Sequence, residues 1–215
     1  VAAQPMMPLG LFRSRNFTAG NIATLSIYAG LSLVAFLITI FVQQVGHYTA
    51  TAAGLTMVPM SILMFFLASR FGKLSGEHGP RMFMTVGPLI VAAGFVTMLF
   101  IDASANYWGM LPGILLFGIG LSVTVAPLTA AILGAVDSKR SGIASAINNV
   151  VARVAGLVAV ALIGTVTGYN LNLVGFRNGL VLSIVLFVVG GLVSFVGIRN
   201  PKKPTADQLQ APAVE

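Results

Sequence analysis

The chain has 215 residues, of which 57% are hydrophobic and only 8% are charged. Soluble globular domains carry about 25% charged residues, so the composition excludes an ordinary soluble protein and predicts an integral membrane protein. Its apolar runs of about twenty or more consecutive positions make that protein all-α. A net charge of +7 does not indicate a nucleic-acid partner, because the basic residues are scattered in ones and twos between apolar runs. The chain has no Cys and only two His, and no spacing of its His, Asp and Glu residues indicates a metal site, a cofactor or an enzyme's catalytic group.

Six apolar runs follow one another, and each is long enough to cross a bilayer as a helix. We predict a cytoplasmic lead-in or linker over residues 1–16, a six-helix transmembrane domain over 17–198 and a disordered cytoplasmic tail over 199–215. The breaks carry the Gly, Pro and polar residues of water-exposed turns, which we expect over segments that include Gly72–Arg81 and Tyr169–Asn178. The predicted spans are Phe17–Gln43, Ala52–Phe71, Met82–Ile101, Met110–Val136, Ile143–Gly168 and Gly179–Ile198.

The positions of lysine and arginine predict the orientation of these spans. Cytoplasmic loops hold most such residues, whereas translocated loops hold few. The three loops that follow spans one, three and five carry a single basic residue, Arg177, in the last of them. Arg153 lies inside the fifth span. Both termini are therefore predicted to be cytoplasmic. The ten basic residues on the predicted cytoplasmic side are Arg13, Arg15, Arg70, Lys73, Arg81, Lys139, Arg140, Arg199, Lys202 and Lys203.

The first span carries a polar stripe, because its polar residues recur at steps of three, four or seven and so share one helical face. Such a stripe must face something wet or polar inside a membrane. One interpretation is a substrate cavity, and the other is hydrogen bonding between packed helices, which Ser, Thr and Asn also provide. The residues of the stripe are Asn21, Thr24, Tyr28, Ser32, Thr39 and Gln43.

Spans two, four and five also have distinctive residues. Pro59 and Pro127 each remove a backbone hydrogen bond, and both are predicted to bend their helices. Arg153 is the only ionisable side chain at membrane depth, and Asn149 is on the same face of span five. Arg153 is predicted either to line the cavity beside Asn149, or to reach the cytoplasmic surface or a neighbouring helix.

Five segments, taken together and in order, resemble the last six spans of the fourteen-span drug:proton antiporters of the major facilitator superfamily. The resemblance covers nearly the whole chain and implies a carboxyl-terminal six-helix half-bundle, in which spans one, two, four and five line a central path. It also implies that spans three and six face lipid. The segments are Leu11–Phe17, Gln43–Leu55, Gly72–Arg81, the Gly-rich fourth span and Ser141–Gly156.

The segment Gly72–Arg81 resembles a degenerate copy of the superfamily's cytoplasmic signature Gly-x-Leu-x-Asp-Arg-x-Gly-x-Arg, which helps to hold the inward gate. Gly76 and Glu77 replace the Asp and Arg of that signature, so the resemblance implies a turn more than a charge relay. The gating residues that it implies are Gly72, Leu74, Gly79 and Arg81.

The resemblance implies half of a secondary active transporter in the cell membrane, which contributes the substrate cavity for proton-coupled efflux of hydrophobic or cationic small molecules. The alternative is a non-transporting six-span scaffold or interaction subunit. Proton coupling needs a protonatable group in the membrane, and no Asp or Glu lies inside a predicted span. We therefore expect, besides a small-molecule substrate and the bilayer, a partner: the missing amino-terminal half or a second copy.

Overall fold

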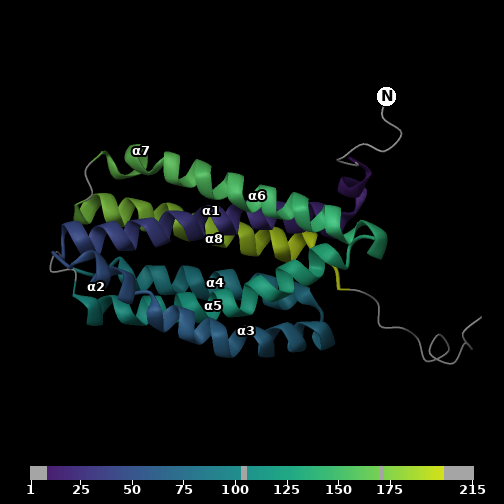
Figure 1. Cartoon of the computed structure of the whole chain (residues 1–215), viewed down its shortest axis with the longest axis horizontal. Helices are drawn as coiled ribbons and strands as arrows, with labels where there is room; N and C mark the ends of the chain where they lie inside the picture. Colours follow the sequence, from purple (N-terminus) through teal and green to yellow (C-terminus); the bar gives the residue numbers. More distant parts are fainter. Residues whose placement is uncertain (1–8, 103–105, 170–171, 201–215) are drawn as a thin grey trace, which may run out of the picture.

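The computed structural model describes residues 9–102, 106–169 and 172–200. Within this part of the chain, six helical segments are long and apolar enough to cross a membrane (Figure 1). This confirms the predicted all-α, six-span fold class. The six are α1 (Arg15–Gln44), α2 (Ala50–Leu55) with α3 (Val58–His78), α4 (Pro80–Met98), α5 (Tyr107–Leu133), α6 (Ser141–Ala161) and α8 (Leu173–Gly197). Short helices η1 (Leu9–Arg13), η2 (Ser138–Arg140) and α7 (Ile163–Thr167) complete the described elements.

Polar side chains cap the helices at one end of the bundle. Asn106 accepts a hydrogen bond from the backbone N–H of Trp108 at the start of α5, and Asn172 accepts one from Gly175 at the start of α8. Thr49 caps α2 in the same way. An Asn or Thr at this position satisfies a backbone donor that the helix leaves free, which fixes where each of these helices begins.

Two predicted turns are wrong over most of their length. Residues 72–78 continue α3 as helix, and the chain reverses only at Gly79, whose φ of 87° favours glycine. Residues 173–178 open α8. Polar residues at these places extend the helices into the water-facing layer, because a helix need not end where its apolar run ends.

Pro59 also differs from its predicted role. Span two is interrupted at residues 56–57, and Pro59 occupies the second position of the new helix α3. A first-turn proline removes no helical hydrogen bond, so Pro59 starts a helix and does not bend the interior of one. Pro127 does lie inside the continuous helix α5, where it is buried.

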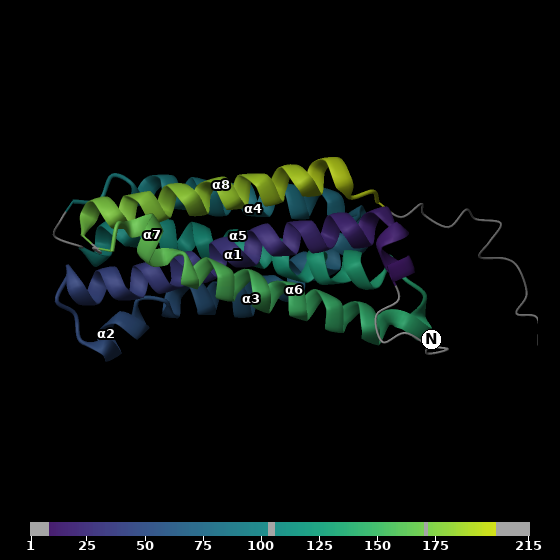
Figure 2. The same ribbon diagram turned by 90° about the horizontal axis from the view of Figure 1, so that it is seen from above.

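The six spans form three layers, most clearly seen in Figure 2. Helices α4 and α8 contact each other on one side, α1 and α5 lie in the middle, and α6 and α3 lie on the other side. Helix α1 contacts α6 and α8, and α5 correspondingly contacts α3 and α4. The first three spans and the last three therefore repeat one arrangement, with α1 matching α5, α3 matching α6 and α4 matching α8.

Aromatic side chains and glycines hold the middle of this bundle together. The fully buried rings of Phe95, Phe117 and Phe187 come from α4, α5 and α8, with centroids 5.0 to 6.4 Å apart. On α5, a Cβ at Gly120 would lie 2.6 Å from the backbone oxygen of Gly87 on α4. Helices α4 and α5 thus approach each other at small residues, as close helix pairs in membranes do.

The start of α1 and the end of α8 lie at the same end of the bundle (Figure 1). There the side-chain amide of Asn16 donates to the carbonyl of Arg199, and the Arg199 N–H donates to the Asn16 side-chain oxygen, at 2.8 and 2.9 Å. The ends of α3 and α5 and the start of α6 are at this end as well, so the basic residues beside them gather there. The predicted cytoplasmic side remains a prediction, and the predicted disordered tail over 199–215 lies outside the described residues from 201 onward.

Candidate functional site

A pocket of about 540 Å³ lies between α1 and α6, near the middle of both helices. Four of the residues named from the sequence line it together: Tyr28 and Ser32 from α1, and Asn149 and Arg153 from α6. The remaining lining residues are Ala152, Gly156, Leu157 and Val160. The pocket therefore combines hydrogen-bonding groups and one cation with aliphatic walls, which is the usual composition of a small-molecule site.

Gly156 sets the distance between the two helices at this pocket. A Cβ at Gly156 would lie 2.6 Å from the Oγ of Ser32, which is closer than real Cβ contacts. The missing side chain thus lets α6 approach α1 while the Ser32 hydroxyl remains at the pocket wall.

Arg153 is exposed and lines the pocket. Its guanidinium makes no hydrogen bond or ion pair with any residue in the described part of the chain. A cation at membrane depth is costly unless it is paired or hydrated. The guanidinium is therefore not bound to a neighbouring helix and remains available to a ligand, to water or to a partner, and its role in a substrate cavity stays a prediction.

Asn21 and Thr24 belong to a different environment from Tyr28 and Ser32. Both are buried, and the side-chain amide of Asn148 on α6 donates to Thr24 Oγ1 at 2.7 Å and to Asn21 Oδ1 at 3.4 Å. This part of the stripe forms hydrogen bonds between packed helices, which is the alternative interpretation of the sequence. Sequence reasoning chose Asn149 and missed its neighbour, although adjacent helical positions point about 100° apart, so each asparagine of the pair serves a different surface.

Thr39 and Gln43 lie farther along α1 and do not line this pocket. The Thr39 hydroxyl donates to the carbonyl of Ala35 at 2.8 Å, and the Gln43 amide donates to the carbonyl of Thr39 at 3.2 Å. Both are half-buried. Bonds of this kind satisfy polar groups within one helix, so the structure does not bring these two residues together with Arg153.

The segment with the gating signature lies at the predicted cytoplasmic end. A small pocket of about 180 Å³ there is lined by Gly72 and Ser75 of α3, Pro80 of α4 and Ala130 of α5, among others. A Cβ at Gly72 would be 3.4 Å from that of Ala126, so α3 and α5 lie close at this point. The side chain of Leu74 is exposed.

Arg81 binds the end of α8. Its Nε donates to the carbonyl of Phe195 at 2.9 Å, and its guanidinium carbon is 4.8 Å from the centre of the Phe195 ring. Asn200 joins the same contact, because its side chain accepts from the Arg81 N–H and donates to the carbonyl of His78. A side chain at Gly79 would collide with Asn200. In this conformation Gly79 and Arg81 therefore tie the α3–α4 turn to α8.

Comparison with curated proteins gives relatives that are transport and resistance proteins and not enzymes. The chain is 24% identical over 206 residues to the methylenomycin A resistance protein of Streptomyces coelicolor, covering 94% of this chain and 43% of that protein. It is 32% identical over 169 residues to the multidrug export protein EmrB of Haemophilus influenzae, covering 74% and 31%. It is 28% identical over 139 residues to the riboflavin transporter RibZ of Clostridioides difficile, covering 65% and 30%. The chain thus spans less than half the length of these relatives.

The family comparison covers most of the chain. Residues 2–160 match the model described as Major Facilitator Superfamily, and the matched region reaches almost to the end of the fifth span. Six apolar spans and transporter relatives make this a multi-pass membrane protein of the plasma membrane. Because the family model matches well over half of its residues, the chain belongs to the major facilitator superfamily.

Proposed function

We propose that the chain is the carboxyl-terminal six-span half of a fourteen-span, proton-coupled secondary transporter that exports small molecules. The observation that carries this proposal is the pocket between α1 and α6, where Arg153 has no bonding partner among the described residues and faces the same space as Tyr28, Ser32 and Asn149. An unpaired cation at membrane depth is costly and serves no purpose in a structural scaffold. In a substrate cavity the same cation can bind the substrate.

The lining of the pocket supports a substrate with an apolar body and a hydrogen-bond acceptor. Leu157 and Val160 provide aliphatic surface, while the guanidinium of Arg153 and the hydroxyls of Tyr28 and Ser32 provide donors. Hydrophobic compounds fit this description directly. A cationic compound needs a carboxylate opposite Arg153, which we assign to a second half of the transporter because no lining residue of this pocket is acidic.

Two observations support the assignment to one half of a larger transporter. The chain covers 43% or less of the length of each relative named above. Its two three-helix units repeat one arrangement (Figure 2), as the repeats nested in each six-span half of the superfamily do. The partner is then an amino-terminal half or a second copy of this chain.

The exposed faces of α3 and α6 agree with such a partner. Phe65 and Phe66 of α3 and Leu157 of α6 are 80%, 64% and 72% exposed, and both helices lie on the same side of α1 and α5 (Figure 2). A second half placed against this side encloses the pocket. Where the partner is the amino-terminal half, that position would also bring its membrane carboxylates near Arg153 and supply the proton site that this chain lacks, whereas a second copy brings no membrane carboxylate.

The test is dye efflux from energised cells that express the chain together with its amino-terminal half, with Arg153→Gln as the variant. We expect Arg153→Gln to lower the initial efflux rate at least about tenfold, as expected when one charged contact with the substrate is lost. Arg140→Gln, an exposed arginine beside the start of α6, is the matched control and should retain the rate. Efflux that is equal in all three, with equal amounts of protein in the membrane, contradicts the proposed site and favours the scaffold.

A further inference from the structure

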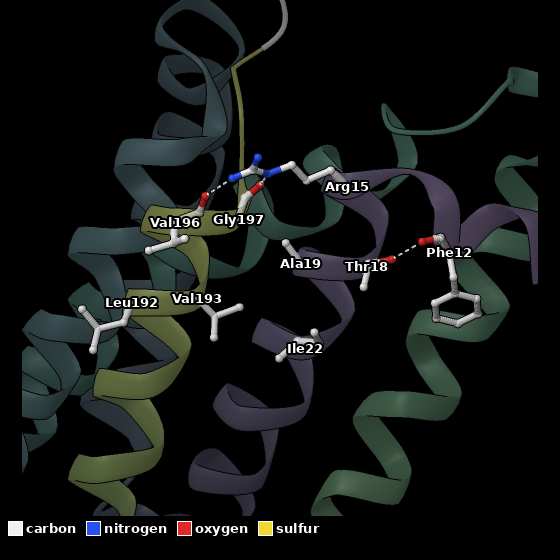
Figure 3. A pocket seen from close by; sticks show the side chains of 9 residues that line it. All are labelled: Phe12, Arg15, Thr18, Ala19, Ile22, Leu192, Val193, Val196 and Gly197. Carbon is white, nitrogen blue, oxygen red and sulfur yellow. Dashed lines mark hydrogen bonds between the residues drawn. The ribbon is translucent and has the colours of Figure 1, made fainter.

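An apolar groove of about 570 Å³ runs between α1 and α8 at the predicted cytoplasmic end of the bundle (Figure 3). The floor is narrow because Ala19 and Gly197 are in direct contact. Ile22 of α1 and Val193 of α8 face each other across it, Leu192 and Val196 extend its aliphatic lining along α8, and Arg15 lies at its mouth. From Arg15 to Ile22 the groove extends about 10 Å along α1, at about 1.5 Å per helical residue.

Arg15 is held in place at this mouth. Its Nε donates to the carbonyl of Gly197 at 3.1 Å, and its Nη2 donates to the carbonyl of Val196 at 2.6 Å (Figure 3). These carbonyls belong to the last turn of α8, where the helix leaves them without partners. The third nitrogen, Nη1, has no bonding partner among the residues that the structure describes, and the side chain is exposed. A fixed guanidinium therefore presents a free donor and a positive charge above an apolar groove.

The groove opens onto an apolar surface and is separate from the substrate pocket. Ile22 and Leu25 on α1 are 46% and 47% exposed, and Leu192 and Val196 on α8 are 55% and 65% exposed. The proposed substrate pocket lies between α1 and α6, whereas this groove lies between α1 and α8. An exposed aliphatic surface at the depth of these spans contacts the hydrocarbon of the bilayer.

We propose that this groove binds an anionic phospholipid of the cytoplasmic leaflet, with an acyl chain between α1 and α8 and the phosphate against Arg15. Charge complementarity identifies the occupant. Arg13, two residues before Arg15, and Arg199, two residues after Gly197, add positive charge at the same end. Phosphate oxygens match the donors of a guanidinium, and basic clusters beside membrane helices attract anionic lipids. The proposal rests on the predicted orientation and goes beyond the proposed transport function.

A tryptophan at position 12 reports occupancy, because Phe12 belongs to the lining of the groove, at its edge beside Thr18, and the exchange of one aromatic ring for another is conservative. The only native tryptophan, Trp108, lies at the opposite end of the bundle and is replaced by Phe. The full chain carrying Phe12→Trp is reconstituted into phosphatidylcholine vesicles, and quenching is compared between phosphatidylglycerol and phosphatidylcholine with brominated acyl chains. Met82→Trp is the control reporter, since Met82 is exposed at the same end beside Arg81 but outside the groove.

We expect brominated phosphatidylglycerol to bind near the groove reporter, Phe12→Trp, about fivefold more strongly than brominated phosphatidylcholine, the factor that one basic residue near an anionic surface provides. In that background, Arg15→Gln should abolish this preference, Arg15→Lys should retain part of it, and Arg140→Gln should retain it fully.

Equal quenching of the groove reporter by the two lipids overturns the proposal, as does an equal preference at the groove reporter and the control reporter. Absence of quenching of the groove reporter by either lipid also overturns it, because the groove is then filled by protein. The comparison of the two reporters decides the question even if Arg15→Gln does not fold.

Discussion

The side-chain amide of Asn148 on α6 donates a 2.7 Å hydrogen bond to the hydroxyl of Thr24 on α1, and this bond crosses 124 positions of the sequence. Thr24 is completely buried. We expect Asn148→Ala to lower the free energy of unfolding by about 1 kcal/mol, within the range measured for hydrogen bonds between membrane helices. Unfolding of the purified chain in detergent, followed by circular dichroism, measures the change.

Asn149→Ala is the matched control for this prediction. The Asn149 amide donates only to the carbonyl of Ser145 in its own helix, so its removal should change stability by less than about 0.5 kcal/mol. Equal losses in the two variants would mean that the bond between α6 and α1 is not a significant source of stability.

The pocket itself is tested by thiol labelling, which is clean because the chain has no Cys. Ser32→Cys should react quickly with a small water-soluble thiol reagent, since Ser32 lines the pocket. Ser26→Cys, six residues earlier on α1 and buried at 9% exposure, should react slowly. A transported hydrophobic compound should protect the thiol introduced at position 32, whereas equally slow labelling at both positions would mean that the pocket is closed to water.

Much of this fold follows from the sequence, because each span must bury its backbone polar groups as a helix and only long apolar runs remain stable in lipid. The helix ends do not follow in the same way. The apolar run of the second span ends near Phe71, yet α3 continues to His78, since polar residues are favourable in a helix that has left the hydrocarbon. The side chain of Asn172 caps α8, whose first residue, Leu173, lies six residues before the predicted span.

Four pocket residues were predictable, because Tyr28 and Ser32 share a helical face and Arg153 and Asn149 are polar residues on one face of an apolar helix. The sequence does not show which part of the polar stripe on α1 is covered by a neighbouring helix. Asn148 covers the Asn21 and Thr24 part of the stripe, and this depends on how far α6 is shifted along α1. The binding of Arg81 to the end of α8 depends on a contact 114 positions away and was not predicted.

The close contact of α4 and α5 predicts a large effect of a single methyl group. Gly120→Ala places a Cβ against the backbone oxygen of Gly87, so we expect a loss of about 1–3 kcal/mol in the free energy of unfolding. Gly109→Ala on the same helix meets nothing within 4 Å and should not destabilise the chain. Detergent unfolding of the two variants measures the difference, and an unchanged stability of Gly120→Ala would contradict the described packing of α4 on α5.

The orientation of the bundle is tested with two exposed positions at its opposite ends. Lys73→Cys, in the last turns of α3, should be labelled from the cytoplasm, and Tyr169→Cys, between α7 and α8, should be labelled from the other side. Ser75, in the same helix as Lys73, is only 3% exposed and is unsuitable. Labelling of intact cells by an impermeant reagent distinguishes the two sides. Reaction of both positions from one side would refute the six-span topology.

The absence of acidic side chains from the membrane interior leads to the central claim. Glu77 lies at the end of α3 and Asp137 follows α5 at the same end of the bundle. Asp102 follows α4, and the remaining two acidic residues, Asp207 and Glu215, lie beyond the last span. A proton-driven transporter needs a carboxylate that binds and releases a proton within the membrane. We therefore propose that the chain contributes the candidate substrate pocket and that the proton site lies in the second half of the transporter.

Gradient-driven uptake of a fluorescent hydrophobic dye into proteoliposomes tests this claim most directly. Vesicles with an imposed pH gradient are prepared with the chain alone and with the chain plus its amino-terminal half. We predict no accumulation with the chain alone, and uptake that an uncoupler abolishes once the second half is present. Robust uphill uptake by the chain alone, abolished by the uncoupler, would contradict the account, because it would place the proton site within these 215 residues.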